Sequence, residues 1–394
     1  MWKKSQTQTV FLLAPLVLIS ALAQDIYVPT LPDIVHSFNT TPGRVQLTLS
    51  LFMVFTGLSQ LIIGPLSDQY GRRLPALWST GLYVLGSLLC SLAPSINILI
   101  LGRIIEAIGG CGALVISFAI VRDCHSGQKA SKIFSYINAV VCISPLIAPF
   151  LGASLNLLFN WRAPFIFLTL IGAFTFLILK SKFKESQNPQ NKVKLNLKLF
   201  KRYYKILNNI NFITYGFCAT SGLTVFFTYF SSSPYLLISD LHVPESHFGF
   251  YFALIAALSS SGSLTAAHMI SKISIFKLIL LGSIGMLLSA ALMISWYLIA
   301  GLSLTGFLVP MGMAGFSCSL LFGAGAAGAL EPFGDMAGTA AALLGAFEFM
   351  TAAIIGTFVL QWEVHSTLPL GLTVLVLGIV NLCICGVYYK KSKK

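Results

Sequence analysis

The chain has 394 residues, of which 56% are hydrophobic and only 9% are charged. So few charged residues cannot cover the surface of a soluble globular protein of this length. The formal net charge of +13 is compatible with nucleic-acid binding, but the positions of the basic residues point to a different partner.

Stretches of mostly apolar residues follow one another along the whole chain. A bilayer core about 30 Å thick needs about 20 helical residues to cross, and a helix satisfies its backbone groups within its own segment. The sequence therefore predicts an all-α polytopic membrane protein with twelve transmembrane helices. The predicted spans are residues 10–29, 45–65, 75–94, 97–121, 132–157, 163–180, 210–232, 247–268, 275–299, 304–328, 337–360 and 368–389.

The basic residues concentrate in alternate loops between these spans. If the N-terminus lies in the cytoplasm, only Arg44 and Arg162 fall on the outside. This distribution follows the positive-inside rule, which predicts a multi-pass protein with both termini cytoplasmic. The surplus charge then faces anionic lipid, so we expect the lipid bilayer and no nucleic acid as a partner.

The N-terminus allows two interpretations. Lys3 and Lys4, followed by an apolar run from Val10, resemble a cleavable signal peptide. We expect the first helix to be retained, because its removal would leave an odd number of spans and no even division into halves.

A change of composition marks the middle of the chain. Residues 181–209 are rich in Lys and Asn and separate six predicted spans from six. We expect an N-terminal six-helix bundle over residues 1–180, a cytoplasmic basic connector over 181–209 and a C-terminal six-helix bundle over 210–394. The connector segment KLNLKLFKRYYKIL has the pattern of a basic amphipathic helix on the inner leaflet.

Residues 64–73, GPLSDQYGRR, form the predicted loop after the second span. They resemble the signature G-x-L-x-D-x-x-G-R-[RK] of the major facilitator superfamily, carried here by Gly64, Asp68, Gly71, Arg72 and Arg73. Gly64 permits a close helix contact, and Gly71 permits a positive φ. The alternative is a charged loop that only anchors the inside face.

The resemblance implies gating contacts for this loop. In the family the aspartate, here Asp68, meets the N-terminal end of a helix in the other half. The arginine, here Arg72, meets an acid at the cytoplasmic end of the fourth helix, and Asp123 stands at that position.

Two further motifs lie inside predicted spans. Residues 103–109 resemble the family pattern R-x-x-Q-[GA]-x-G, with Arg103 in place and Glu106 where glutamine is usual. Residues 144–152, SPLIAPFLG, resemble the proline–glycine motif of the antiporter branch, carried by Pro145, Pro149 and Gly152. The prolines each remove a backbone donor and bend the helix, and Gly152 allows close approach at the bundle interface.

Shorter echoes at residues 25–32, 160–165 and 337–345 resemble the Bcr/CflA group of twelve-helix drug:proton antiporters. The resemblance implies a monomeric, proton-coupled exporter in the cytoplasmic (inner) membrane of a bacterium. It would export small molecules, either drugs or a metabolite such as a siderophore, by alternating access. The alternative is a proton-coupled importer of a small metabolite with the same fold, which the proline motif disfavours.

Ionisable residues inside the spans are the candidates for proton coupling, because such groups are costly at bilayer depth and mark ion or substrate paths. They are Asp25, Arg103, Glu106 and Glu348. Asp25 and Arg103 lie at a similar predicted depth, roughly 8 and 9 Å from the outer edge, so we expect them to interact. The alternatives are a water-exposed Asp25 at a helix end and an Arg103 bound to a backbone carbonyl.

Glu348 is predicted roughly 16 Å inside its span, near the middle of the membrane. It is either a cation- or proton-responsive acid in the central cavity or a protonated side chain hydrogen-bonded to a neighbouring helix. Four aromatic residues are candidates for lining the substrate cavity: Tyr27, Phe227, Tyr229 and Phe347. Packing and interface anchoring are the alternative for each of them.

Other chemistries are not indicated. The histidines and cysteines have no metal-ligand spacing, so we expect no metal and no disulfide. No phosphate-binding glycine loop or nucleophile elbow is present. We therefore expect no cofactor and no enzymatic activity, and transport must draw on an ion gradient or on the gradient of the substrate. A passive channel would show polar pore-lining repeats, which are also missing.

Overall fold

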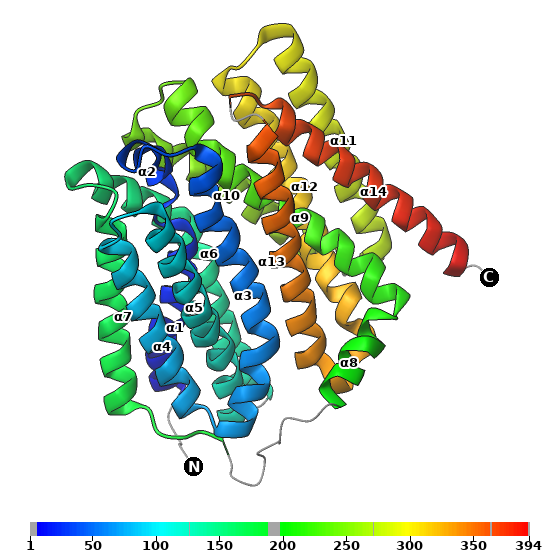
Figure 1. Ribbon diagram of the computed structural model, residues 1–394. Coiled ribbons are helices and arrows are strands. Elements are labelled where there is room, and N and C mark those ends of the chain that lie inside the picture. The colour runs from blue at the N-terminus through cyan, green and yellow to red at the C-terminus, as the bar shows by residue number, and fades with distance from the viewer. Residues whose placement is uncertain (1–5, 126, 188–197, 271, 363–364, 393–394) are drawn as a thin grey trace. The chain divides into compact units, whose positions relative to one another are not determined.

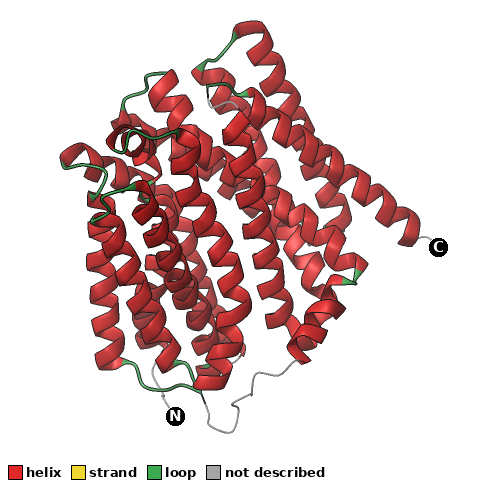
Figure 2. Cartoon of the chain, viewed as in Figure 1, coloured by secondary structure: helices red, strands yellow, loops and turns green. Residues whose placement is uncertain are grey.

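The computed structural model describes residues 6–125, 127–187, 198–270, 272–362 and 365–392 (Figure 1). Within these ranges all regular secondary structure is helical (Figure 2). Twelve helices of the described chain are long and apolar enough to cross a membrane. The chain divides into two compact units, Met1–Leu197 and Lys198–Lys394, and each contains six of these helices. The predicted fold class is confirmed.

Unit 1 contains the first seven α-helices and one short 3₁₀-helix. They are α1 (Gln6–Asp25), η1 (Val28–Thr30), α2 (Leu31–Ser37), α3 (Pro42–Tyr70), α4 (Arg73–Ser91), α5 (Ile96–Cys124), α6 (Gly127–Leu158) and α7 (Ala163–Lys182). The start of α1, the α3–α4 turn and the end of α7 lie at the same end of the unit (Figure 1).

In its described part, unit 2 begins with a short basic helix and continues with six long α-helices, a π-helix and a 3₁₀-helix. They are α8 (Lys198–Leu207), α9 (Ile210–Pro234), the π-helix η3 (Tyr235–Asp240), α10 (Glu245–Met269), α11 (Ile275–Ala300), α12 (Leu304–Leu330), the 3₁₀-helix η4 (Glu331–Met336), α13 (Ala337–Trp362) and α14 (Leu368–Ser392).

The first span differs most from its prediction. It covers Thr7–Ser37, because the chain continues through η1 and α2 after α1 ends at Asp25. Pro29 causes the break, since it lacks the N–H that would bond to the carbonyl of Asp25 four residues earlier. Asp25 therefore stands at a break inside the span and not close to its outer end.

Small residues let the helices of unit 1 pack closely. A Cβ at Gly109 of α5 would clash with the backbone of Tyr83 on α4, and a Cβ at Gly86 of α4 would clash with the backbone of Glu106. Such contacts are typical of membrane helices, where packing replaces the hydrophobic driving force. They hold α4 and α5 together at the level of Glu106.

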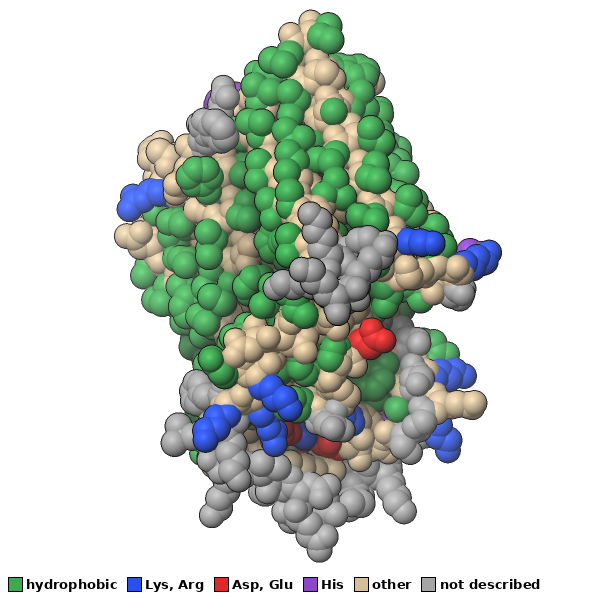
Figure 3. Space-filling model, turned by 90° about the vertical axis from the view of Figure 1, so that its right-hand side faces the viewer, with side chains coloured by type: hydrophobic (Ala, Val, Ile, Leu, Met, Phe, Trp, Pro, Cys, Tyr) green, Lys and Arg blue, Asp and Glu red, His purple; other side chains and the backbone are tan. Residues whose placement is uncertain are grey.

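The outer surface suits a lipid environment. Hydrophobic side chains cover a broad area of the face shown in Figure 3, and charged side chains are sparse there. Large apolar side chains such as Leu170, Phe174 and Ile299 are exposed. In water such a surface would drive aggregation, so the twelve long helices form a multi-pass membrane protein.

Candidate functional site

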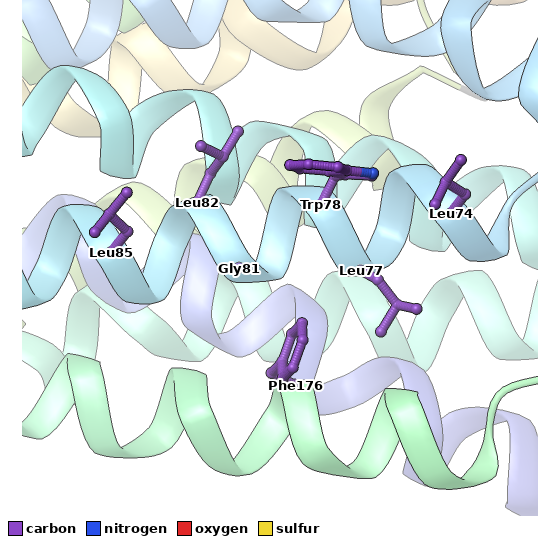
Figure 4. A pocket seen from close by; sticks show the side chains of 7 residues that line it. All are labelled: Leu74, Leu77, Trp78, Gly81, Leu82, Leu85 and Phe176. Carbon is purple, nitrogen blue, oxygen red and sulfur yellow. The ribbon is translucent and has the colours of Figure 1, made fainter.

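An apolar groove lies on the outside of α4 and α7 (Figure 4). The residues that line it are Leu74, Leu77, Trp78, Gly81, Leu82, Leu85 and Phe176. Of these, Leu74, Trp78 and Leu85 are exposed. The groove therefore faces the lipid side and offers no group that could carry a proton.

The polar centre of unit 1 is a buried ion pair on α5. The Nη1 atom of Arg103 lies 2.6 Å from Oε2 of Glu106, and neither side chain is exposed. The other carboxylate oxygen accepts a hydrogen bond of 2.7 Å from the hydroxyl of Ser87 on α4. Such contacts offset the large cost of removing both charges from water.

The Arg103 guanidinium also joins α5 to α1 and α3. Its Nη1 donates a 2.9 Å hydrogen bond to the carbonyl oxygen of Ala23 on α1. Its Cζ lies 4.2 Å from the ring centroid of Tyr27 and 4.0 Å from that of Phe52, which are favourable cation–π distances. The Nε and Nη2 atoms have no hydrogen-bond partner among the described residues.

Asp25 is buried next to this centre, with only 3% of its surface exposed. This excludes the interpretation as a water-exposed acid at a helix end. No ion pair joins Asp25 to Arg103 in the described part of the chain, because Arg103 pairs with Glu106 and with the carbonyl of Ala23 instead. The expected Asp25–Arg103 interaction is therefore not a direct ion pair. The Oδ1 atom of Asp25 finds no hydrogen-bond partner within the described residues.

Helix α6 packs against the break at Asp25. A Cβ on Gly152 would overlap the carbonyl oxygen of Ile26, so only glycine fits at this position. The close approach expected for Gly152 is thus a contact within unit 1. Helix α6 runs through Pro145 and Pro149 without ending, and Ser144, directly before Pro145, is buried.

A second ionic cluster lies at the end of α3 and the turn into α4. We call this segment, residues 67–73, the gate loop. The Nε atom of Arg72 lies 2.6 Å from Oδ2 of Asp123 at the end of α5, and its Nη1 lies 2.7 Å from Oδ1 of Asp68. Nη1 also donates a 2.7 Å hydrogen bond to the hydroxyl of Ser67. Gly71 has a φ of 93°, which explains glycine there. The close contact expected of Gly64 is not seen within the described part of the chain, where nothing lies within 4 Å of a Cβ built on it.

In unit 2 the one acid predicted at mid-membrane depth is buried. Glu348 on α13 is 7% exposed, and its Oε1 atom has no hydrogen-bond partner among the residues described. Both interpretations of Glu348, a cation- or proton-responsive acid and a protonated side chain hydrogen-bonded to a neighbouring helix, stay predictions. The neighbouring Phe347 is 45% exposed.

The other three cavity candidates are buried within their own units. The hydroxyl groups of Tyr27 and Thr48 form a hydrogen bond of 3.0 Å, and the ring of Tyr27 lies against the guanidinium of Arg103. Phe227 fills the space next to Gly356, and the ring of Tyr229 stacks on Phe307 at 5.9 Å. Each of these three residues has a packing partner within its own unit, and a role in lining a substrate cavity stays a prediction.

Comparisons with known proteins identify the family. Residues 13–357 match the profile of the Major Facilitator Superfamily. The chain belongs to this superfamily. A chloramphenicol resistance protein of Pseudomonas aeruginosa is 31% identical over 369 residues, which cover 93% of this chain and 87% of that protein. A bicyclomycin resistance protein homolog of Haemophilus influenzae is 25% identical over 350 residues, 88% of this chain and 87% of that protein.

The fold of this superfamily member is also found among solved structures. A bacterial homolog of the human lysosomal transporter Spinster, crystallised in an inward-facing and occupied conformation, superposes with a TM-score of 0.76. The alignment covers 100% of this chain and 98% of that chain at 16% identity. The likeness to the Bcr/CflA group that the motifs predicted is confirmed by the relatives, and members of the superfamily are transporters and in general not enzymes.

The sequence did not point to two polar residues of this superfamily member. Ser87 supports Glu106, but a serine inside an apolar span carries no signal of its own. Glu185 binds the gate loop through backbone N–H groups of Arg72 and Arg73, although the segment around it was expected to be a basic connector. Among the described residues no group of three or more His, Cys, Asp or Glu side chains could hold a metal.

Proposed function

We propose that this superfamily member is a proton-coupled exporter of drug-like small molecules that works by alternating access as a monomer. It would lie in the cytoplasmic membrane of a bacterium with both termini in the cytoplasm. The two six-helix bundles, residues 1–180 and 210–394, would rock around a central site, with residues 181–209 as a cytoplasmic connector. The predicted boundaries follow from the charge distribution and the composition of the connector.

The observation that carries proton coupling is the buried Asp25 carboxyl. Glu106 already neutralises Arg103, so the guanidinium does not bind Asp25 directly. Burial disfavours the charged form of a carboxyl and a nearby guanidinium favours it. A group held between these opposing effects, with one oxygen that has no partner among the described residues, can bind and release a proton when its surroundings change.

The break in the first span supplies a mechanical link. Asp25 stands where α1 ends, and Gly152 of α6 touches the carbonyl of Ile26 directly after it. A small shift of α6 against α1 would therefore change the surroundings of the carboxyl. One proton that crosses a potential of 100 mV provides about 2.3 kcal/mol, which is enough to drive export against an appreciable gradient.

The names of the two relatives support drugs as substrates. One is a chloramphenicol resistance protein, and the other is a homolog of a bicyclomycin resistance protein. Glu348 would extend the range to cations, since a buried carboxylate attracts a positively charged ligand. A metabolite of similar size and polarity would use the same path.

A screen of drugs and metabolites tests both substrate and direction. Cells that express the protein would be compared with cells that express the Asp25→Asn variant at the same level. We expect the wild type to lower the intracellular content of at least one compound and to raise resistance to it. A compound whose intracellular content rises with the wild-type protein would identify an importer and contradict the proposal.

A further inference from the structure

The segment that follows α7 is bound to the gate loop through a glutamate carboxylate. Oε1 of Glu185 accepts hydrogen bonds from the backbone N–H groups of Arg72 at 2.8 Å, Ser186 at 3.0 Å and Gln187 at 3.0 Å. Oε2 accepts from the backbone N–H of Arg73 at 3.1 Å. Both carboxylate oxygens thus point at the start of α4, where the ends of α3 and α7 also lie (Figure 1).

The attachment is reciprocal. The guanidinium of Arg73, the first residue of α4, donates to the carbonyl oxygens of Phe183 at 2.9 Å and Lys180 at 3.3 Å. The side-chain amide of Gln187 donates to the carbonyl oxygen of Asp68 at 2.8 Å. We call these contacts the clasp. The clasp caps the C-terminal end of α7 with a cation and the N-terminal end of α4 with an anion, as the helix dipoles favour.

Helix α4 has no side-chain cap from its own N-cap residue. The first N–H groups of a helix have no partner inside the helix, and Arg72 at the N-cap position provides no side-chain acceptor for them. Glu185 supplies this acceptor from more than a hundred residues further along the chain. Burial alone favours the neutral acid, but the N–H groups outweigh it and lower the pKa of Glu185 below its ordinary value. The carboxylate is therefore charged at neutral pH.

Gly71 makes the attachment possible. A Cβ at this position would lie 2.5 Å from Oε2 of Glu185, closer than real side chains approach. The glycine of the gate loop therefore has two roles, because it provides both the positive φ of 93° and the space that the carboxylate occupies.

We propose that Glu185 is a positioning residue of the transport cycle, which holds the start of α4 so that Arg72 reaches Asp123 and Asp68. The backbone N–H of Arg72 is bound by Glu185, while its side chain bridges α3 and α5. Loss of the carboxylate would leave the backbone at Arg72 free to shift and would lengthen both ionic contacts. The clasp thus ties the origin of the connector to the gate loop. That the gate loop limits turnover rests on the proposed function.

The variant Glu185→Gln tests the clasp with little change of shape. An amide keeps the size of the side chain but offers one acceptor oxygen in place of two. Lys184→Gln is the matched control, because Lys184 is the exposed neighbour and has no part in the clasp. Purified proteins would be compared by hydrogen–deuterium exchange over residues 70–76. We expect the Glu185→Gln amides to exchange at least roughly tenfold faster, as the loss of a hydrogen bond to a charged group implies, with no change for Lys184→Gln.

This exchange measurement needs no substrate, so it separates failure of the clasp from failure of the proposed function. Unchanged exchange in Glu185→Gln would overturn the clasp itself. Transport then tests the positioning role: kcat should fall with KM retained, and the fall should disappear in an Asp123→Asn background. A fall of equal size in that background would overturn the proposal, as would faster exchange with unchanged kcat. If a variant fails to fold, Gln187→Ala removes one clasp contact with less disturbance and should show the same changes in smaller degree.

Discussion

The contact between Gly152 and the helix break offers a sharp test of the packing around Asp25. In Gly152→Ala the added methyl group would overlap the carbonyl oxygen of Ile26, and the carbonyl carbon would lie 2.8 Å away. Both atoms belong to the backbone, so no side chain can rotate to make room. Helices α6 and α1 would have to move apart at the level of Asp25.

The cost follows from the chemistry of overpacking. Forcing an extra carbon into a packed interior costs about 1–3 kcal/mol. Alanine also stabilises a helix by up to about 1 kcal/mol relative to glycine, which partly hides this cost. Gly64→Ala on α3 is the matched control, because it gains the same helix preference with nothing within 4 Å of its new Cβ. The difference between the two variants therefore isolates the clash.

Thermal melting of the detergent-purified proteins measures this difference. For a domain of 150–250 residues, 1 kcal/mol corresponds to about 2–4 °C. We expect Gly152→Ala to melt about 2–12 °C below Gly64→Ala, and proton-driven transport to slow because the surroundings of Asp25 change. Equal melting temperatures for the two variants would refute the argument that Gly152 fixes α6 against the break.

Two further predictions concern Glu348 and the gate loop. Glu348→Gln should selectively reduce transport of cationic substrates in proteoliposomes. Its melting temperature should be nearly unchanged, because Oε1 has no partner to lose among the described residues. An equal effect of the substitution on cationic and neutral substrates would contradict this prediction. Arg72→Lys should slow turnover roughly tenfold or more, because an ammonium cannot bridge Asp123 and Asp68 as the guanidinium does and a lost hydrogen bond to a charged group costs about 1.5–3 kcal/mol. Substrate affinity in detergent should remain, and its collapse in a folded variant would show another role for the loop.

The sequence was sufficient for the fold because hydrophobic length alone identifies a membrane helix. The contacts of the gate loop were predictable in two different ways. Asp68 and Arg72 are four residues apart at the end of α3, so their spacing places them side by side. The contact of Arg72 with Asp123 was predicted only from the resemblance to the family, because the two residues are far apart in the sequence.

The partners of the buried charges were harder to predict. Arg103 and Glu106 are three residues apart on one helix and can pair there, but depth estimates favoured Asp25 as the partner of Arg103. The position of Asp25 depended on the break at Pro29, which ends α1 four residues before the proline. The proline that causes this break is visible in the sequence, but hydropathy assigns the residues on both sides of it to one span.

The clasp had the weakest signal of all. Glu185 is a single acid in a segment dominated by Lys, and its partners in the gate loop are backbone N–H groups more than a hundred residues earlier. Backbone groups carry no residue-specific pattern, so such a contact is visible only in three dimensions.

The central claim is that the buried carboxyl of Asp25 couples transport to protons. The most direct measurement compares transport by Asp25→Asn and by the wild type in proteoliposomes under an imposed pH gradient. Thermal melting first verifies that the variant has the same melting temperature as the wild type. An amide cannot cycle a proton, so the account predicts that the gradient accelerates the wild type and has no effect on the variant. Export by Asp25→Asn at the wild-type rate, with the same response to the gradient, would contradict it.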